Sequence, residues 1–396
     1  MNDLLHDLGR GTAGALVRHG VLARHTATWA TAHASARALA QAAATIDPSS
    51  TGLYRGAPAV AFALHTAGHR AYRPALTDLD EKIAGLITAR LSAAHHRMDA
   101  RLPPRMREYD LIQGLTGLGA YLLSTGTRPR LLDDVLLYLV RLLQQPVTVH
   151  GHSLPGWWTL DGTTGEPDPD WPLGHGNFGL AHGVAGPVAL LALAARAGHT
   201  VPGQHQALTA ACDLFEKWLR PLPDGGQSWP ETVTLSNWLA GPPATAQPGR
   251  PSWCYGTPGI ARSLQLAALA SAHPRARRRA EDALLSCVTD VRQLDRLQDA
   301  TVCHGWAGLV LTTALVAADT DAANRLRAEL PKLRHAFAAR LAVTPVPGGV
   351  GLLTGADGTL LTIHTLNPTH RSETGWATCL LLTGKKENDR DYFRSR

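Results

Sequence analysis

The chain has 396 residues, a hydrophobic content of 44% and a formal net charge of +6. This charge is modest for the length, and arginine greatly outnumbers lysine, so the charge reflects genome composition more than a nucleic-acid-binding surface. No apolar run is long enough to span a membrane, the N-terminus lacks the apolar core of a signal peptide, and the five cysteines are widely spaced and odd in number, which together predict a cytoplasmic protein.

Two kinds of helical segment alternate along the chain. In the first kind, apolar residues recur every three or four positions, the period of an amphipathic helix. These segments are residues 28–46, 76–92, 131–144, 204–220, 279–297 and 321–342. The second kind is apolar on all sides and follows a short glycine motif. The motifs begin at Gly52, Gly114, Gly183, Gly256 and Gly305, with a weaker one at Gly375.

This alternation repeats with a period of roughly 50–70 residues, which indicates an array of helical hairpins. A helix that is apolar all round is buried, whereas an amphipathic helix keeps one face in solvent. The pattern therefore predicts an all-α fold, an α/α toroid with an inner and an outer ring of helices. The predicted parts are an N-terminal helical segment (1–50), the toroid (51–384) and a polar tail (385–396).

Two stretches rich in proline and glycine, 145–180 and 221–251, interrupt the repeats. A long loop inside a compact domain is often functional. We interpret 145–180 as a lid or groove wall near His182, and we expect His175 within it to shape substrate access without binding metal. The second stretch leads to Arg250.

The glycine motifs each open a predicted inner helix, so they are expected to meet at one end of the toroid. The chemically active side chains within four residues of a motif glycine are Asp110, His182, Cys254, Cys303 and His304. Two thiolates and one imidazole are three possible zinc ligands, and a catalytic zinc typically has three protein ligands and one open position. A free cysteine is also a common core residue, so packing is the alternative interpretation.

Other candidate residues also have a structural alternative. Asp110 suits a helix N-cap, Arg250 a surface ion pair, and Tyr255 a packing position. The remaining cysteines lie inside apolar helical stretches and are expected to pack in the core. They are Cys212, Cys287 and Cys379.

Longer signatures surround the candidate residues. They are Tyr109-Asp110-Leu111-Ile112-Gln113-Gly114-Leu115-Thr116-Gly117, Gly179-Leu180-Ala181-His182-Gly183-Val184-Ala185-Gly186, and the pair Trp253-Cys254-Tyr255-Gly256 and Cys303-His304-Gly305. In combination they resemble the lanthionine synthetase C-like family, the cyclases of class I lanthipeptide biosynthesis. The likeness extends over roughly residues 50–380. It has two departures: Gly375-Trp376-Ala377-Thr378 lacks a second glycine, and the interval from the first glycine motif to Asp110 is too short for the inserted domain of some members.

The resemblance implies a toroid with zinc at one mouth, an enzyme that adds peptide cysteine thiols to dehydroalanine or dehydrobutyrine, and (methyl)lanthionine thioether rings as products. It implies that Zn²⁺ is bound by Cys254, Cys303 and His304. It implies acid/base roles for His182 and Asp110, and positions in the site for Arg250 and Tyr255. The implied partners are a dehydrated precursor peptide with its leader, a dehydratase and an exporter, with the protein either free in the cytoplasm or held at a membrane by a biosynthetic complex.

The sequence disfavours three other functions and leaves a fourth open. A zinc enzyme like the protein prenyltransferase β-subunit is disfavoured by the cysteine pair and by the aromatic content of only 6%. An α/α-barrel glycosidase needs two carboxylates about 5–10 Å apart, and Asp110 is the only acid beside a motif glycine. A non-catalytic peptide-binding scaffold with a structural zinc has no need of an acid/base set. A homologue that joins glutathione to dehydrated residues differs only in its substrate and stays open.

Overall fold

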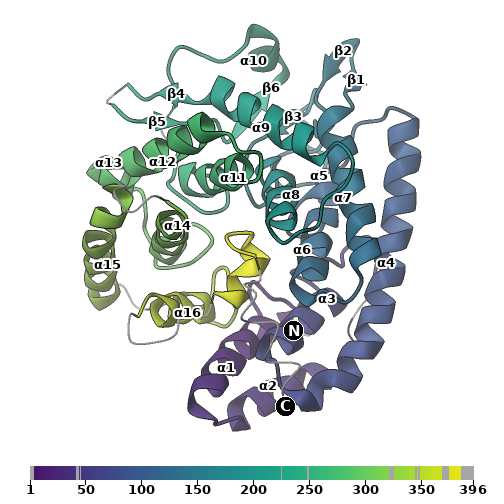
Figure 1. The fold of residues 1–396 in the computed structure, drawn as a ribbon, viewed down its shortest axis with the longest axis vertical. Helices are drawn as coiled ribbons and strands as arrows, with labels where there is room; N and C mark the ends of the chain where they lie inside the picture. The colour runs from purple at the N-terminus through teal and green to yellow at the C-terminus, as the bar shows by residue number, and fades with distance from the viewer. Residues whose placement is uncertain are drawn as a thin grey trace.

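The protein is described from a computed structural model that covers residues 4–41, 44, 46–223, 225–247, 249–320, 325–343, 346, 348–367 and 374–384. Its helices surround a common centre (Figure 1). Within the described residues, seven helices form an inner ring. They are α1 (Thr12–Thr26), α3 (Ala57–Ala67), α6 (Leu115–Thr125), α8 (Ala185–Arg196), α11 (Thr257–Ala270), α14 (Trp306–Ala318) and α16 (Ala356–Leu366). Each packs against the next, and α16 packs against α1, so the ring is closed.

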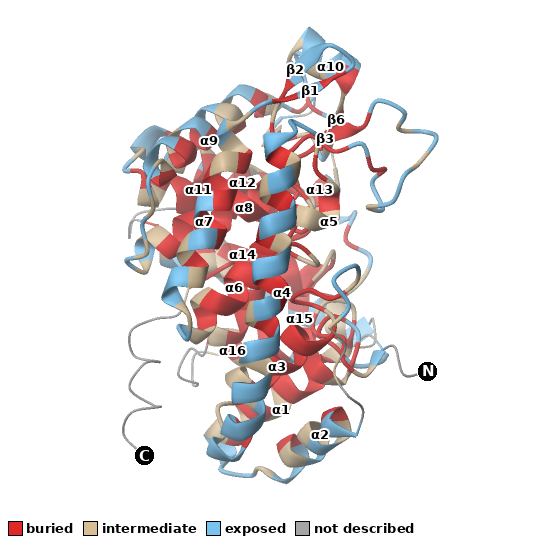
Figure 2. Cartoon of the chain, turned by 90° about the vertical axis from the view of Figure 1, so that its right-hand side faces the viewer, coloured by how far each residue is buried: buried red, intermediate tan, exposed pale blue. Residues whose placement is uncertain are grey.

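The outer ring consists of the helices that follow the inner ones. They are α2 (Ala30–Ala40), α4 (Arg73–Asp99), α7 (Pro129–Gln144), α9 (Gln204–Trp218), α12 (Pro274–Thr289) and α15 (Arg325–Val343). Each packs on its preceding inner helix. Figure 2 shows α4 running along the outside with solvent-exposed residues, while the inner helices are buried. The predicted all-α toroid with two rings is therefore confirmed.

The burial of the two helix types follows from their sequences. In α14, buried residues occur on all sides of the helix, because its core of Leu, Val, Ala and Thr has no charged side chain. In α7, the buried residues Leu132, Val135, Leu136 and Leu139 recur at helical spacing, while Asp134 between them is exposed. Proline at the start of α7 and of α12 fits the first helical turn, whose N–H groups have no partner in the helix.

The two ends of the ring differ from the sequence prediction. Gly375 was expected to open an inner helix, and this is wrong: residues Gly375–Leu380 form the short 3₁₀ helix η3, whose Trp376 is buried and bonds Thr365. The last inner helix instead follows Gly355, and the first follows Gly11. The segment 1–50 thus supplies α1 to the ring. The predicted polar tail, 385–396, lies outside the described residues.

The second glycine of the motifs has a steric function. A Cβ atom on Gly117 would lie 2.1 Å from the backbone oxygen of Leu111, and one on Gly259 would lie 2.0 Å from that of Trp253. The start of each of these inner helices therefore rests directly on the carbonyl group of the loop before it. This contact explains why the motif repeats a glycine three residues after the first.

Short strands order the two interrupting stretches. The antiparallel pairs are β1 (Val147–Val149) with β2 (His152–Leu154), β3 (His175–Asn177) with β6 (Thr232–Thr234), and β4 (Arg220–Pro221) with β5 (Gln227–Ser228). The β3–β6 pair joins the two stretches, with Gly176 opposite Val233. The remaining elements are η2 (Arg70–Tyr72), α5 (Met106–Tyr109), α10 (Leu235–Ala240) and α13 (Val291–Leu294).

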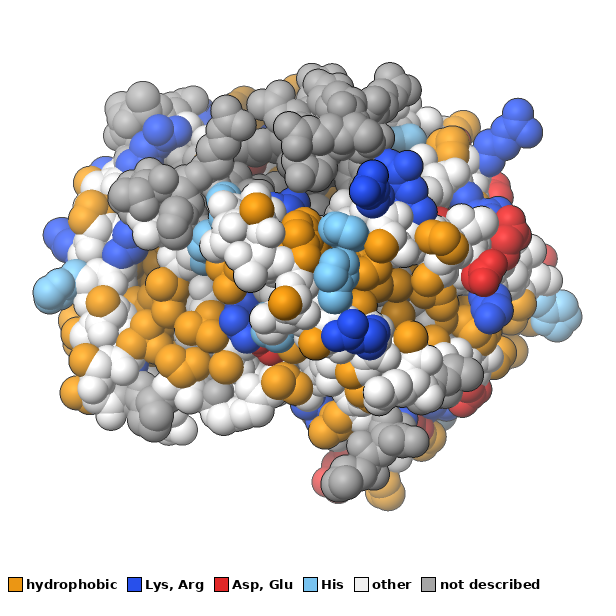
Figure 3. All heavy atoms as spheres, turned by 90° about the horizontal axis from the view of Figure 1, so that it is seen from below, with side chains coloured by type: hydrophobic (Ala, Val, Ile, Leu, Met, Phe, Trp, Pro, Cys, Tyr) orange, Lys and Arg blue, Asp and Glu red, His pale blue; other side chains and the backbone are white. Residues whose placement is uncertain are grey.

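The surface is mixed in character. Figure 3 views the molecule from below, and hydrophobic side chains are exposed there among basic and histidine side chains. Leu360 and Ile363 of α16 are partly exposed, and no outer α-helix follows α16 in the part of the chain that the structure describes. Among the described residues, no helix is both long enough and apolar enough to cross a membrane.

Candidate functional site

The loops that precede the seven inner helices are joined by backbone hydrogen bonds into a closed circle, here called the loop belt. In each step an N–H group of one loop donates to a carbonyl oxygen of the next. The bonds run from Leu8 to Tyr54 (2.9 Å), Tyr54 to Ile112 (3.3 Å), Leu111 to Ala181 (3.0 Å), Ala181 to Cys254 (3.1 Å), Cys254 to Cys303 (3.3 Å), Cys303 to Leu353 (3.0 Å) and Leu353 to Gly9 (2.9 Å). The loop belt holds residues that are far apart in sequence around one rim.

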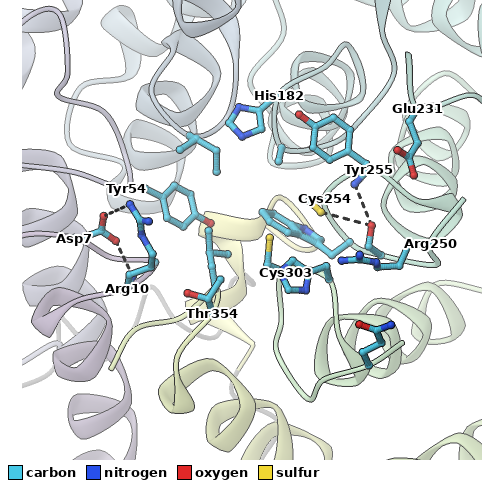
Figure 4. A pocket seen from close by; sticks show the side chains of 18 of the residues that line it. Asp7, Arg10, Tyr54, His182, Glu231, Arg250, Cys254, Tyr255, Cys303 and Thr354 are labelled. Atoms are coloured by element: carbon cyan, nitrogen blue, oxygen red, sulfur yellow. Dashed lines mark hydrogen bonds and ion pairs between the residues drawn. The ribbon is translucent and has the colours of Figure 1, made fainter. Parts of the chain in front are cut away.

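A central cavity of about 900 Å³ lies at this rim, and every loop of the belt contributes to its lining. One lining residue from each loop, in chain order, is Arg10, Tyr54, Ile112, His182, Cys254, Cys303 and Thr354. Figure 4 shows His182, Cys254 and Cys303 around the same space. The expected convergence of the glycine motifs at one end of the toroid is therefore observed.

Cys254 and Cys303 form a thiol pair on neighbouring loops of the belt. Their side chains are hydrogen-bonded to each other, and the Cys254 thiol also lies 3.5 Å from the Ser252 hydroxyl. The bond from Cys303 lowers the pKa of Cys254 to about 6, against the opposing effect of burial, and the bond from Ser252 adds to this. The same contact raises the pKa of Cys303. One sulfur of the pair is thus favoured as a thiolate while the other keeps its proton.

His304 follows Cys303 directly and lines the same cavity. Its Nδ1 lies 3.0 Å from Oδ2 of Asp299, and this hydrogen bond raises the pKa of His304, although burial opposes the shift. As the side chains stand, no three His, Cys, Asp or Glu residues in the described ranges are arranged to hold a metal ion. The donor types nevertheless fit zinc, because two sulfurs in contact and an adjacent imidazole face one cavity.

His182 is paired with Asp110. The Nδ1 atom of His182 lies 2.7 Å from Oδ2 of Asp110, whose other oxygen accepts hydrogen bonds from the N–H groups of Gln113 (2.7 Å) and Gly114 (2.8 Å). The N-cap of α6 is Gly114, so Asp110 is not the N-cap; it orders the loop just before α6 and holds the imidazole at the same time. It is buried behind His182 and does not line the cavity, whereas the other six predicted site residues do.

Tyr255 lies beside His182, with ring centroids 6.0 Å apart. Burial raises the pKa of its phenol, although a hydrogen bond from the Asn177 side chain opposes the shift, so the hydroxyl stays protonated. Asn177 is held in turn, because its Oδ1 accepts the N–H of Gly179 (2.9 Å). Strand β3 thus supplies the side chain that hydrogen-bonds Tyr255.

Arg250 lines the cavity near the thiol pair, and its positive charge opposes the rise in the pKa of Cys303. Glu231 lies beside it and accepts a hydrogen bond from the backbone of Arg250. Burial raises the pKa of Glu231 in spite of this bond and of the positive charge of Arg250.

Two expectations about the first interrupting stretch are wrong, the cavity wall and the role of His175, whereas the lid interpretation stays a prediction. No residue of 145–180 lines the central cavity, so the stretch does not form a wall of it. His175 is completely buried, with Nδ1 3.0 Å from the backbone oxygen of Asp161, so it cannot contact a substrate. The expectation for the other cysteines is correct, since Cys212, Cys287 and Cys379 are all buried.

Some cavity residues were not found by sequence reasoning. Asp7 precedes Gly11 by four residues, as Asp110 precedes Gly114, and its Oδ1 accepts the N–H of Arg10 (2.7 Å). This shared spacing is a signal that could have identified Asp7. Glu231, which lines the cavity, and the supporting residues Asp299 and Asn177 carried no such signal.

Comparisons with known proteins agree with this arrangement. The family model described as lanthionine synthetase C-like protein matches residues 3–381. The nisin biosynthesis protein NisC of Lactococcus lactis subsp. lactis is 26% identical over 271 residues, which are 65% of this chain and 60% of NisC. The match thus spans less than two thirds of that relative. A solved structure of nisin cyclase has a TM-score of 0.77 at 21% identity, over 96% of this chain and 93% of that one, and shares its fold.

Proposed function

Because the chain belongs to the lanthionine synthetase C-like family, we propose that it is a zinc-dependent lanthipeptide cyclase. The reaction adds the thiol of a peptide cysteine to dehydroalanine or dehydrobutyrine. A bond forms between sulfur and Cβ, the carbon–carbon π bond breaks, and Cα receives a proton, so no group leaves. The observation that carries the proposal is the convergence of Cys254, Cys303, His304 and His182 on one cavity.

Cys254, Cys303 and His304 would hold the zinc ion. When bound, zinc would stabilise the substrate thiol as a thiolate. A free thiol has a pKa of about 8.5 and is therefore mostly protonated at neutral pH. The two protein thiolates balance the charge of the ion. Such a set keeps a substrate sulfur nucleophilic, whereas a histidine-rich set favours activation of water.

His182 would donate the proton to Cα. Attack on Cβ leaves negative charge on the carbonyl as an enolate, and an imidazolium is a suitable acid near neutral pH. Because Asp110 binds Nδ1 at 2.7 Å, the proton that can be transferred is the one on Nε2. The bonds from Gln113 and Gly114 hold Asp110 in place, so the imidazole has a fixed orientation.

Arg250 would stabilise the enolate oxygen through its guanidinium, since a positive charge near a developing oxyanion lowers the energy of the transition state. Tyr255 would hydrogen-bond the peptide as a neutral phenol. Its hydroxyl accepts the bond from Asn177, which leaves its own proton for donation.

The proposed substrate is a precursor peptide with its leader that a dehydratase has already acted on, because the reaction requires an alkene. The ring-containing product would pass to an exporter. We place the protein in the cytoplasm, alone or associated with a membrane through such a complex.

The test combines metal analysis with an assay of ring formation. Cyclisation within a peptide leaves its mass unchanged, so ring formation is read as loss of N-ethylmaleimide labelling of a dehydrated, cysteine-containing peptide. We expect about one zinc per chain and ring formation in the wild type, and loss of both in Cys303→Ala. Wild-type protein that is folded but contains no zinc and forms no ring would overturn the proposal.

A related assay distinguishes the cyclase from a homologue that joins glutathione to dehydrated residues. A dehydrated peptide without cysteine is offered together with glutathione, and addition raises the peptide mass by one glutathione. Ring formation without glutathione addition supports the cyclase. Glutathione addition without ring formation supports the other homologue.

A further inference from the structure

His304 and Asp299 form a pair at the edge of the central cavity. The Nδ1 atom of His304 lies 3.0 Å from Oδ2 of Asp299, and each side chain is about one third exposed. The Thr301 hydroxyl lies 3.5 Å from the same ring nitrogen. Nδ1 therefore faces the loop that carries His304, and Nε2 is the ring nitrogen that remains for another partner.

Asp299 is fixed by the backbone of this loop. Its Oδ1 accepts the N–H (2.8 Å) and the hydroxyl (2.6 Å) of Thr301, and its backbone oxygen accepts the N–H of Trp306 (3.0 Å). A Cβ atom on Gly305 would lie 2.1 Å from Oδ1, so only glycine allows the carboxylate to take this position. One carboxylate oxygen is thus held by the loop, which directs the other to His304.

We propose that Asp299 is a positioning residue that fixes the tautomer of His304, with the proton on Nδ1 and the lone pair on Nε2 as the zinc ligand. This inference rests on the proposed function, because it assumes that His304 binds zinc. A carboxylate on the distal nitrogen of a metal-binding histidine orients the ring and makes it a better donor, and its removal typically weakens metal binding by about 10- to 100-fold.

The site has a second pair of the same kind. Asp110 binds Nδ1 of His182 at 2.7 Å and is likewise held by N–H groups of its own loop. In both pairs the carboxylate is locked at the start of an inner helix, and the histidine faces the cavity. In both pairs Nδ1 is bonded to the carboxylate and Nε2 is left for the proposed role, as the acid N–H of the His182 imidazolium and as the ligand atom of His304.

The test measures zinc affinity of the metal-stripped full chain by competition with a chromophoric chelator. We expect Asp299→Ala to bind zinc about 10- to 100-fold more weakly than the wild type. Asp299→Asn retains an acceptor oxygen but not the charge, so we expect a smaller loss. The matched control is Asp295→Ala, an exposed carboxylate of the same segment, for which we expect no change. Thermal unfolding of the metal-free proteins checks that each variant is folded.

A second readout examines the tautomer directly. In zinc-loaded protein labelled with ¹⁵N-histidine, the His304 signals are assigned by their loss in His304→Gln, and we expect a protonated Nδ1 and a metal-bound Nε2. If Asp299→Ala does not fold, the zinc affinity of Asp299→Asn and this spectrum test the inference. Zinc bound through Nδ1, or unchanged affinity in both Asp299 variants of a protein that binds zinc, would overturn the inference alone. Absence of zinc from the wild type would overturn the proposed function as well.

Discussion

Asp110 binds the imidazole of His182 through Oδ2 at 2.7 Å while its Oδ1 receives two N–H groups at the start of α6. One side chain thus orders the loop before α6 and also binds a candidate proton donor. The consequence is that the position of the imidazole depends on the loop residues Gln113 and Gly114, just before α6. Replacing Asp110 therefore alters both the local fold and the chemistry of His182.

The first prediction concerns pH. Burial lowers the pKa of His182, but the hydrogen bond and the charge of Asp110 outweigh burial and hold this pKa above its ordinary value of 6.5. If the imidazolium is the proton donor, the single-turnover rate of cyclisation falls as the pH rises through this raised pKa. In Asp110→Asn the charge is lost, so the fall is expected at lower pH. An unchanged profile in the variant would contradict the assignment.

The same pair makes a prediction about stability. Because the pKa of His182 is raised in the folded state, the pair contributes its full stabilisation below pH 6.5, and this contribution is lost as the pH rises through the folded-state pKa. Urea unfolding of the wild type across this range is expected to show the loss. The free energy of unfolding of Asp110→Asn should be lower overall and should depend less on pH.

His182→Asn separates proton transfer from metal binding. The variant removes the proposed acid, so we expect the cyclisation rate to fall by about 10²- to 10⁴-fold. His182 is not among the proposed ligands, so the zinc content is expected to match that of the wild type. Elemental analysis and the N-ethylmaleimide assay measure both quantities on one preparation. Full activity in this variant would remove His182 from the mechanism.

Gly259→Ala tests the steric function of the glycine motif. The added Cβ would lie 2.0 Å from the backbone oxygen of Trp253, which forces a shift next to Cys254. We expect a loss of about 1–3 kcal/mol in the free energy of unfolding. The matched control is Gly85→Ala on the exposed side of α4, where nothing lies within 4 Å and the change should stabilise by about 0.5–1 kcal/mol. Equal effects of the two substitutions would refute the steric account.

Arg262 tests a buried polar network inside the inner ring. It is almost completely buried, and it donates to the Leu382 backbone oxygen (2.9 Å) and the Gln265 side chain (2.5 Å) and pairs with Asp319 (2.9 Å). Arg262→Met leaves buried acceptors without a donor, so we expect a loss of about 2–4 kcal/mol, measured by chemical unfolding.

The control for this substitution is Arg275→Met. Arg275 is mostly exposed and lies 3.6 Å from Glu216, so its removal is expected to cost less than about 0.5 kcal/mol. A similar loss in both variants would show that burial of Arg262 does not determine its contribution.

Much of the fold could be predicted because its repeat is visible in the local sequence pattern. The alternation of helix types and the spacing of the glycines depend on each hairpin alone. Helix α1 was not predicted as an inner helix, because its basic residues interrupt the apolar pattern; one of them, Arg18, pairs with Asp357 of α16. This pair lies at the junction where the ring closes, and a local sequence pattern does not reveal that junction.

The candidate site likewise contains residues that a local pattern predicts and residues whose contacts depend on the tertiary fold. His182, Cys254 and Cys303 could be found because each lies within two residues of a motif glycine. The bond from Asn177 to Tyr255 depends on how β3 lies against the loop belt, which no local pattern encodes. Asp299 is close to His304 in sequence, but only the turn of the loop brings its carboxylate to Nδ1.

The loop belt also gives this repeat protein a different thermodynamic character from an open solenoid. In an open array, stability is close to a sum of nearest-neighbour terms, and the end repeats need polar caps. Here the bonds between Leu353 and Gly9 and between Leu8 and Tyr54 leave no end repeat within the belt. Fraying from a terminus would break two junctions at once, so the toroid should unfold in a single cooperative transition.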